Sequence, residues 1–146
     1  MAIRVQQAPF DFGAEAAAFA RGRTDVGAVV TFSGLVRDVA GGLSEMVIEH
    51  YPGMTERALE KIRAEAMARW SLADALIIHR YGPMQPGDQI MMVATASAHR
   101  GDAFAAAEFL MDYLKSRAPF WKKETTGAGD GWVAAKAEDE AALNRW

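Results

Sequence analysis

The spacing of hydrophobic residues predicts two long helices. Apolar residues recur in both at steps of three and four, which is typical of a helix with one buried face. The positions are Leu59, Ile62, Ala66 and Trp70 in the first helix, and Phe104, Ala107, Met111 and Leu114 in the second. Thr55 is a candidate cap for the first helix and Asp102 for the second. Pro119 is expected to end the second helix and to force Ala118 into an extended conformation.

Shorter runs of β-branched, aromatic and alternating residues predict strands between these helices. The strands are expected at 27–37, 45–51, 76–81, 89–96, 120–125 and 132–134, with further helices at 12–21 and 136–146. The order is therefore αββαββαββα. This order favours an α+β fold, in which helices pack on one face of a mainly antiparallel sheet. The length of 146 residues fits one domain over residues 1–146.

Composition excludes several classes of site. The chain has no cysteine, which excludes disulfides, thiolate metal sites and catalysis by a protein thiol. The histidines His50, His79 and His99 are too scattered to suggest a metal site, and His79 is expected to be packed in its strand. We therefore predict neither a metal nor a bound cofactor. The sequence has no apolar run of about 18 residues and no secretory signal, so we expect a cytoplasmic protein without membrane contact.

Basic residues gather around the second long helix, although the whole chain has a formal net charge of −3. His99 and Arg100 precede this helix, and four basic residues with no acidic one lie between Lys115 and Lys123. A local basic cluster on an acidic protein suggests one anionic ligand, and a helix N-terminus adds backbone N–H donors that favour phosphate. The residues are expected to converge around this helix. Lys115 follows the core position Leu114, so we expect it to be partly enclosed and open to tuning by its neighbours.

Each member of this cluster also has a simpler explanation. A lysine at the end of a helix usually interacts with the helix dipole in solvent. Lys122 and Lys123 could protect an edge strand from aggregation, and His99 and Arg100 could form a surface turn. On a strand at 120–125, Phe120, Lys122 and Glu124 would share one face, with Trp121, Lys123 and Thr125 on the other.

Five segments resemble the large, catalytic subunits of molybdopterin synthase, the MoaE family. These segments are VTFSGLVRD, IEHYPGMTE, HRYGPMQPGD, SAHRGDAF and MDYLKSRAPFWKKE, in the order seen in that family. The resemblance covers the chain from about Gly27 to Trp146. It implies an α+β fold of the α/β-hammerhead type with an added small β subdomain.

The resemblance also implies an activity and partners. The family's enzyme is a sulfurtransferase of molybdenum cofactor biosynthesis, which converts precursor Z (cyclic pyranopterin monophosphate) to molybdopterin by installing a dithiolene. The sulfur arrives as a thiocarboxylate on the C-terminal glycine of a small ubiquitin-like subunit. Two large subunits form a homodimer at the centre of a heterotetramer. The absence of cysteine agrees with a sulfur that comes from another molecule, and the basic cluster agrees with a phosphate-bearing substrate.

The matching motifs assign roles to individual residues. The resemblance implies that Lys115 and Lys122 are catalytic. The implied substrate-binding residues are Leu35, Val36, Arg37, His99, Arg100, Lys115, Lys122, Lys123 and Glu124. The partner's tail is expected to lie beside a strand edge such as 120–125. The segment 132–146 could contact a partner or pack on its own domain.

Two other functions compete with this interpretation. A non-catalytic module could bind a phosphorylated metabolite or an acidic tail without making product. A nucleic-acid role is weaker, because the basic residues are local, the pI is about 5.6 and the aromatic residues fall mostly at core spacing.

Overall fold

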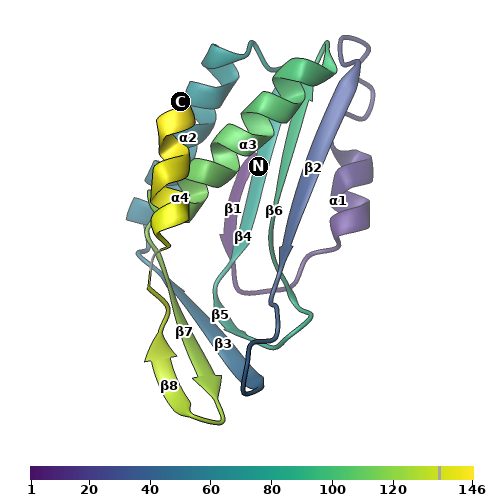
Figure 1. Ribbon diagram of the computed structural model, residues 1–146. Coiled ribbons are helices and arrows are strands. Elements are labelled where there is room, and N and C mark those ends of the chain that lie inside the picture. Colours follow the sequence, from purple (N-terminus) through teal and green to yellow (C-terminus); the bar gives the residue numbers. More distant parts are fainter. Residues whose placement is uncertain (135) are drawn as a thin grey trace.

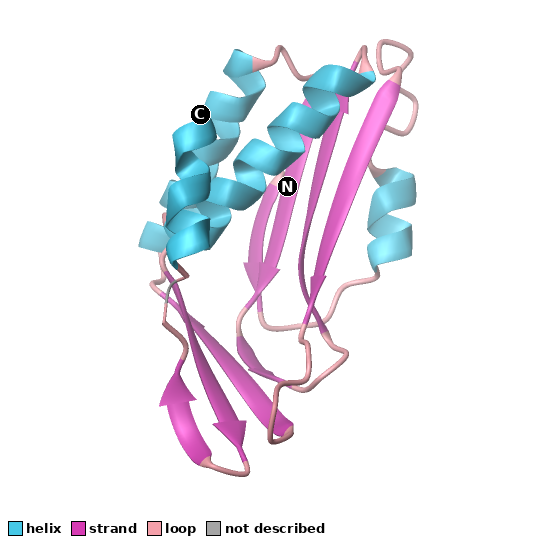
Figure 2. Ribbon diagram, viewed as in Figure 1, coloured by secondary structure: helices cyan, strands magenta, loops and turns pink. Residues whose placement is uncertain are grey.

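The chain forms two four-stranded sheets, and the second extends from one end of the first (Figures 1 and 2). The computed structural model describes residues 1–134 and 136–146. In the first sheet the strands are β1 (Ile3–Gln6), β4 (Asp74–Arg80), β6 (Gln89–Ser97) and β2 (Ala28–Leu35), in that spatial order. Only β1 and β4 pair in parallel, while β4, β6 and β2 are antiparallel neighbours.

Helices cover both faces of the first sheet. The long helices α2 (Met54–Arg69) and α3 (Arg100–Ser116) pack on one face, and the short helix α1 (Phe12–Ala18) packs on the other (Figure 1). Successive side chains of β4 point to opposite faces of the sheet. Ile77 belongs to the cluster under α2 and α3, while Ile78 belongs to the cluster under α1. The expectation that all helices pack on one face was therefore wrong for α1.

The second sheet is entirely antiparallel. Its strands are β5 (Gly82–Met84), β3 (Leu43–His50), β7 (Phe120–Thr126) and β8 (Gly129–Trp132), in that spatial order. Two antiparallel-rich sheets with packed helices confirm the predicted α+β class, and the second sheet corresponds to the predicted small β subdomain.

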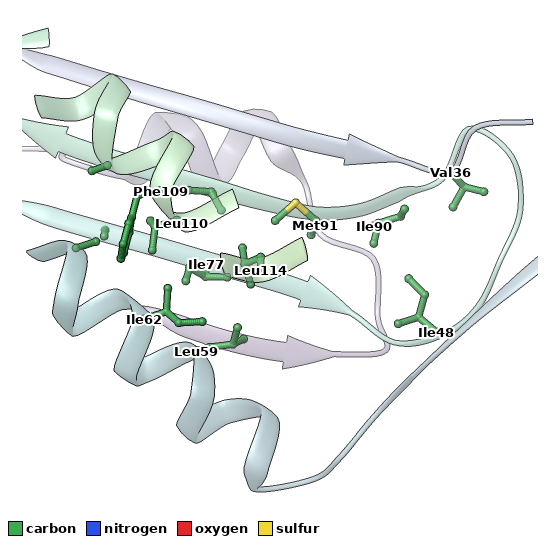
Figure 3. Close-up of a cluster of buried hydrophobic side chains, with 14 of the residues drawn as sticks. Val36, Ile48, Leu59, Ile62, Ile77, Ile90, Met91, Phe109, Leu110 and Leu114 are labelled. Atoms are coloured by element: carbon green, nitrogen blue, oxygen red, sulfur yellow. The ribbon is translucent and has the colours of Figure 1, made fainter. Parts of the chain in front are cut away.

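One hydrophobic cluster joins the two sheets. It combines Ile77 and Met91 of the first sheet with Ile48 of the second and with Phe109 and Leu114 of α3 (Figure 3). Burying large apolar side chains stabilises a fold by about 1.5–3 kcal/mol each, so this cluster helps to hold the two sheets together. It fixes the end of α3 against the start of β7.

The C-terminal segment packs on its own chain. It contains α4 (Ala137–Ala142) and the 3-10 turn η1 (Leu143–Arg145). The Trp146 ring makes edge contacts with Trp70 and Phe109, and its indole N–H donates to Asp112 at 2.6 Å. Of the two alternatives for 132–146, the structure favours packing within the chain for this part of the segment.

Several local predictions were wrong for identifiable reasons. Strands β1 and β5 were missed because they have only four and three residues. The N-caps are Gly53 and His99 rather than Thr55 and Asp102. Phe104 is 61% exposed, because it lies outside the buried face of α3, which alanines form in the first half of the helix and larger residues form in the second half. The buried positions of α3 are Ala103, Ala106, Ala107, Phe109, Leu110 and Leu114.

None of the described helices has the length and apolar character needed to cross a membrane.

Candidate functional site

The predicted site residues lie at opposite ends of α3. Strand β6 leads into the helix, which returns across the sheet, so Lys115 lies back at the end where β6 begins (Figure 1). Arg100 and Lys115 are 15 residues apart, which corresponds to about 22 Å along a helix axis. The expectation that all basic residues converge around this helix was therefore wrong within one chain. One group lies at the C-terminal end of α3 and the other at its N-terminal end.

Lys115 and Lys122, the lysine pair, belong to the C-terminal group. Lys115 is in the last turn of α3, and Lys122 is the third residue of β7, which begins after Pro119 has ended the helix. The two ammonium groups lie within electrostatic reach, because the charge of Lys115 lowers the pKa of Lys122. Lys115 is exposed, so the expectation that it is partly enclosed was wrong. Lys122 is the enclosed member of the pair.

Burial is the main reason why the pKa of Lys122 is lowered from 10.5 to about 8. Lys115 and Lys136 lower the same pKa further, while Asp139 and Glu124 oppose them. At pH 7 a group with this pKa is neutral in about a tenth of molecules, whereas an ordinary lysine is almost fully charged. A neutral amine can accept a proton, so Lys122 is equipped for general base chemistry near neutral pH.

Four rings lie beside the lysine pair, and we call them the ring layer: His50, His79, Tyr81 and Phe120. His79 and Phe120 stack with centroids 3.7 Å apart and an interplanar angle of 16°, and His50 and Tyr81 lie 4.1 Å apart. His50 and Phe120 are paired residues on β3 and β7. The ring layer therefore crosses from the first sheet to the second, and its member His79 lies within electrostatic reach of both lysines.

A buried hydroxyl fixes the start of β7. The Thr55 side chain accepts from the N–H of Tyr51 at 2.9 Å and donates to the carbonyl of Pro119 at 3.0 Å. Thr55 therefore ties the beginning of α2 to the residue before β7, instead of capping its own helix. This tie limits how far Phe120 and Lys122 can move.

Lys123 and Glu124 follow Lys122 on β7 and lie on different faces of the strand, as predicted from the alternation of side chains. Lys123 is 3.8 Å from a carboxylate oxygen of Asp130 and lies 6.0 Å from the ring of Trp132, so it already has partners on β8. Glu124 acts on Lys122 by raising its pKa. Among these two, Glu124 is better placed to affect the lysine pair.

The segment 35–37 begins with the last residue of β2, at the same end of the first sheet as the lysine pair. Leu35 and Arg37 are exposed, whereas the Val36 side chain is 2% exposed and belongs to the core. Both backbone polar groups of Val36 are hydrogen-bonded: its N–H donates to the backbone carbonyl of Asp88, and its carbonyl accepts from the N–H of Gly87. Val36 thus holds its two neighbours at the surface.

His99 and Arg100 are exposed at the other end of α3, beside a hollow of about 470 Å³. The hollow is lined by Gly27, Ala28, Ala98, His99, Arg100 and Gly101. A Cβ on Gly27 would lie 2.2 Å from the carbonyl oxygen of Ala98, so only glycine allows this close approach. Free N–H groups at the helix start and the Arg100 guanidinium make this a suitable place for an anion.

The expectation of a free strand edge at 120–125 was wrong for most of that segment. β3 pairs with one side of β7, and β8 pairs with the other side from Lys123 to Thr126. The Val133 N–H also donates to the carbonyl of Lys122 at 2.8 Å. Among the described residues, β7 therefore leaves an unpaired edge only near Phe120 and Trp121.

Sequence spacing could not reveal the ring layer. Its members come from β3, β4, the segment after β4, and β7, and no periodic pattern links them. His79 was expected to be packed, and its 7% exposure confirms this. Among the described residues, no cluster of three His, Cys, Asp or Glu side chains is arranged to hold a metal ion.

Comparison with known proteins agrees with the resemblance found in the sequence. The family model described as MoaE protein matches residues 5–117. The molybdopterin synthase catalytic subunit of Cereibacter sphaeroides is 66% identical over 146 residues, with 100% of both chains covered. A solved MoaE protein from Burkholderia ambifaria has a TM-score of 0.84 at 56% identity, covering 100% of this chain and 98% of that one. Molybdopterin synthase from Staphylococcus aureus also has a TM-score of 0.84, at 29% identity, covering 92% of this chain and 98% of that chain. The chain therefore belongs to the MoaE family.

Proposed function

We propose that this chain is the catalytic subunit of a molybdopterin synthase, a sulfurtransferase in which Lys115 and Lys122 are the catalytic pair. The observation that carries the proposal is the meeting of these lysines at the junction of α3 and β7, where burial lowers the pKa of Lys122 to about 8. Two relatives that match 100% and 99% of this chain are both named molybdopterin synthase catalytic subunit. The shared hydrophobic core supports a single working domain over residues 1–146.

The two lysines are suited to different tasks. The proposed substrates are precursor Z and a small ubiquitin-like subunit whose C-terminal Gly-Gly ends in a thiocarboxylate. Its sulfur forms a C–S bond at a carbon of the pterin side chain while a C–O bond at that carbon breaks and the oxygen leaves with a proton. Water then cleaves the acyl–sulfur bond, which releases the small subunit's C-terminal carboxylate and leaves the sulfur on the substrate. Lys122, partly neutral, accepts a proton from the attacking water. Lys115, exposed and cationic, stabilises negative charge that develops on the substrate or on the acyl oxygen.

The remaining predicted residues bind substrate. Arg37 and Leu35 lie at the same end of the sheet as the lysine pair, and Glu124 and Lys123 follow Lys122 on β7. Val36 contributes by holding 35–37 in place. His99 and Arg100 would bind the phosphate through the guanidinium and the helix start.

Because Arg100 and Lys115 are separated by about 22 Å along α3, two copies would be needed to complete such a site. Strand β2 is an edge of the first sheet and exposes Val29, Phe32 and Leu35, with Phe104 of α3 also exposed. A twofold pairing places the same surface of each copy against the other in opposite directions. It would bring His99 and Arg100 of one copy toward the lysine pair of the second. This arrangement fits the predicted homodimer with a small subunit at each end.

Substitution of the lysines tests the proposal. With precursor and thiocarboxylated small subunit supplied, Lys115→Ala and Lys122→Ala are each expected to reduce turnover by about 10²–10⁴-fold. Lys61→Ala removes an exposed lysine of α2 and serves as the matched control, with turnover unchanged. Near-normal turnover in both site variants would contradict the assignment.

Arginine variants separate the two roles. Arginine keeps the positive charge but does not lose its proton in this pH range. Lys115→Arg is therefore expected to retain more activity than Lys122→Arg. Binding of precursor without any product in the wild type, with active small subunit present, would favour the binding-module alternative.

A further inference from the structure

His79 is held in one orientation under the start of β7. It lies on the face of β4 that carries Ile77, next to Val5 of β1 and Met91 of β6. Its Nδ1 is 2.8 Å from the carbonyl oxygen of Arg80. A carbonyl can only accept, so Nδ1 carries the hydrogen. Burial lowers the pKa of His79 to about 3, so the ring is neutral at physiological pH.

The fixed ring determines where Phe120 lies. The two rings stack nearly in parallel at 3.7 Å, and Phe120 lies two residues before Lys122 on the same face of β7. On the other side of the chain, Thr55 holds Pro119. The path of the chain from Pro119 to Lys122 is thus held by the Thr55 hydrogen bond and the ring stack, in addition to the pairing of β7 with β3.

We propose that His79 is a positioning residue for the lysine pair, because its ring supports Phe120 and thereby keeps the Lys122 ammonium partly buried beside Lys115. The inference deepens the proposed function and rests on it for its catalytic meaning. Several charged or titratable groups act on Lys122 or on His79 from the elements packed around them: Lys115 of α3, Lys136 and Asp139 at the start of α4, Glu124 of β7 and His50 of β3. A neutral His79 ring adds no positive charge to those of Lys115, Lys122 and Lys136.

Two substitutions of His79 separate the effect of the ring from that of the imidazole nitrogens. His79→Phe keeps a flat neutral ring that can stack on Phe120. His79→Ala removes the ring and opens the space beneath Phe120 to water. Ile78→Ala is the matched control, because this neighbour is fully buried on the opposite face of β4 and also loses core packing.

The Lys122 pKa is measured on the full-length protein without substrate, by NMR titration of ¹³C-labelled lysines assigned with Lys122→Arg. His79→Ala is expected to raise this pKa by about 1 unit, because the ammonium regains water. His79→Phe and Ile78→Ala are expected to leave it within about 0.3 unit of the wild-type value. An unchanged value in His79→Ala, an equal rise in Ile78→Ala, or an equal rise in His79→Phe would each overturn the proposal.

Turnover in the complete complex gives the second measurement. A 1-unit rise reduces the neutral fraction of Lys122 at pH 7 about tenfold, so kcat of His79→Ala is expected to fall about tenfold with little change in KM. The rising limb of its pH profile should move to higher pH, and His79→Phe should restore the wild-type profile. A loss of activity that comes only from a higher KM, with kcat and the pH profile of kcat unchanged, would overturn the positioning role. If Lys122→Ala proved fully active, the proposed function would fail, but the NMR titration would still decide whether His79 positions Lys122.

Discussion

The burial of His79 predicts a loss of stability in acid that one substitution should remove. The pKa of His79 is about 3 in the folded chain and 6.5 in an unfolded one, so between these values only the unfolded state binds the proton. The unfolded state is then favoured as pH falls. The stabilising contribution of the neutral ring is complete above pH 6.5 and is lost progressively toward pH 3.

The expected magnitude follows from the difference between the two pKa values. Each pH unit below 6.5 reduces the free energy of unfolding by about 1.4 kcal/mol for one such group. At pH 4.5, two units below, the loss is about 2.7 kcal/mol relative to pH 7.5. This figure depends little on the folded value, because pH 4.5 is still well above it.

Urea unfolding of the wild type and of His79→Phe, at equal protein concentration, measures the effect at pH 7.5, 6.5, 5.5 and 4.5. Phenylalanine cannot bind the proton, so the wild type should lose about 2.7 kcal/mol more than the variant between pH 7.5 and 4.5. Carboxylates titrate in both proteins and cancel in the comparison. Ile78→Ala, which changes no titratable group, should show the wild-type pH dependence at lower overall stability.

A difference below about 0.5 kcal/mol between wild type and His79→Phe over this range would refute the argument. It would mean that the imidazole is protonated in the folded protein or is free to leave its site. Burial would then not hold the ring neutral below pH 6.5.

Three further predictions concern packing. Gly27→Ala should cost about 1–3 kcal/mol in urea unfolding and weaken precursor binding, because the new Cβ meets the Ala98 carbonyl oxygen at 2.2 Å and displaces the turn that carries His99. Thr55→Val should cost about 1–3 kcal/mol, since the Tyr51 N–H loses its acceptor; urea unfolding that matches the wild type would contradict this. Phe109→Ala should cost about 3–5 kcal/mol by the same assay, as it removes a fully buried ring from the main core.

Local sequence signals were sufficient to predict α3 and β7. The helical spacing and Pro119 determine where the helix stops and the strand begins, and these are the elements that bring the lysine pair together. The face of α3 was predicted less well. Large apolar residues dominate a periodicity argument, whereas close contact with the sheet selected alanines and left Phe104 exposed.

The candidate site was predictable only in part, because its contacts join residues that are distant in the chain. The lysines were found through the resemblance and a local excess of charge. The stack between His79 and Phe120 joins residues 41 positions apart, and no local pattern encodes such a contact. His99 and Lys115 are far apart because α3 is long, and the sequence did predict a long helix. That the two residues lie at opposite ends of the sheet became clear only from the path of β6 and α3.

The structure gives a physical reason for having two lysines rather than one. Two cations within electrostatic reach repel each other, so one of them releases its proton more easily. Burial decides which one does so, and it favours Lys122, because Lys115 remains in contact with water. A single lysine could act either as a cation that stabilises negative charge or as a base that accepts a proton. The proposed chemistry needs both roles during the same reaction. The greater burial of Lys122 than of Lys115 is therefore what makes two identical side chains chemically different.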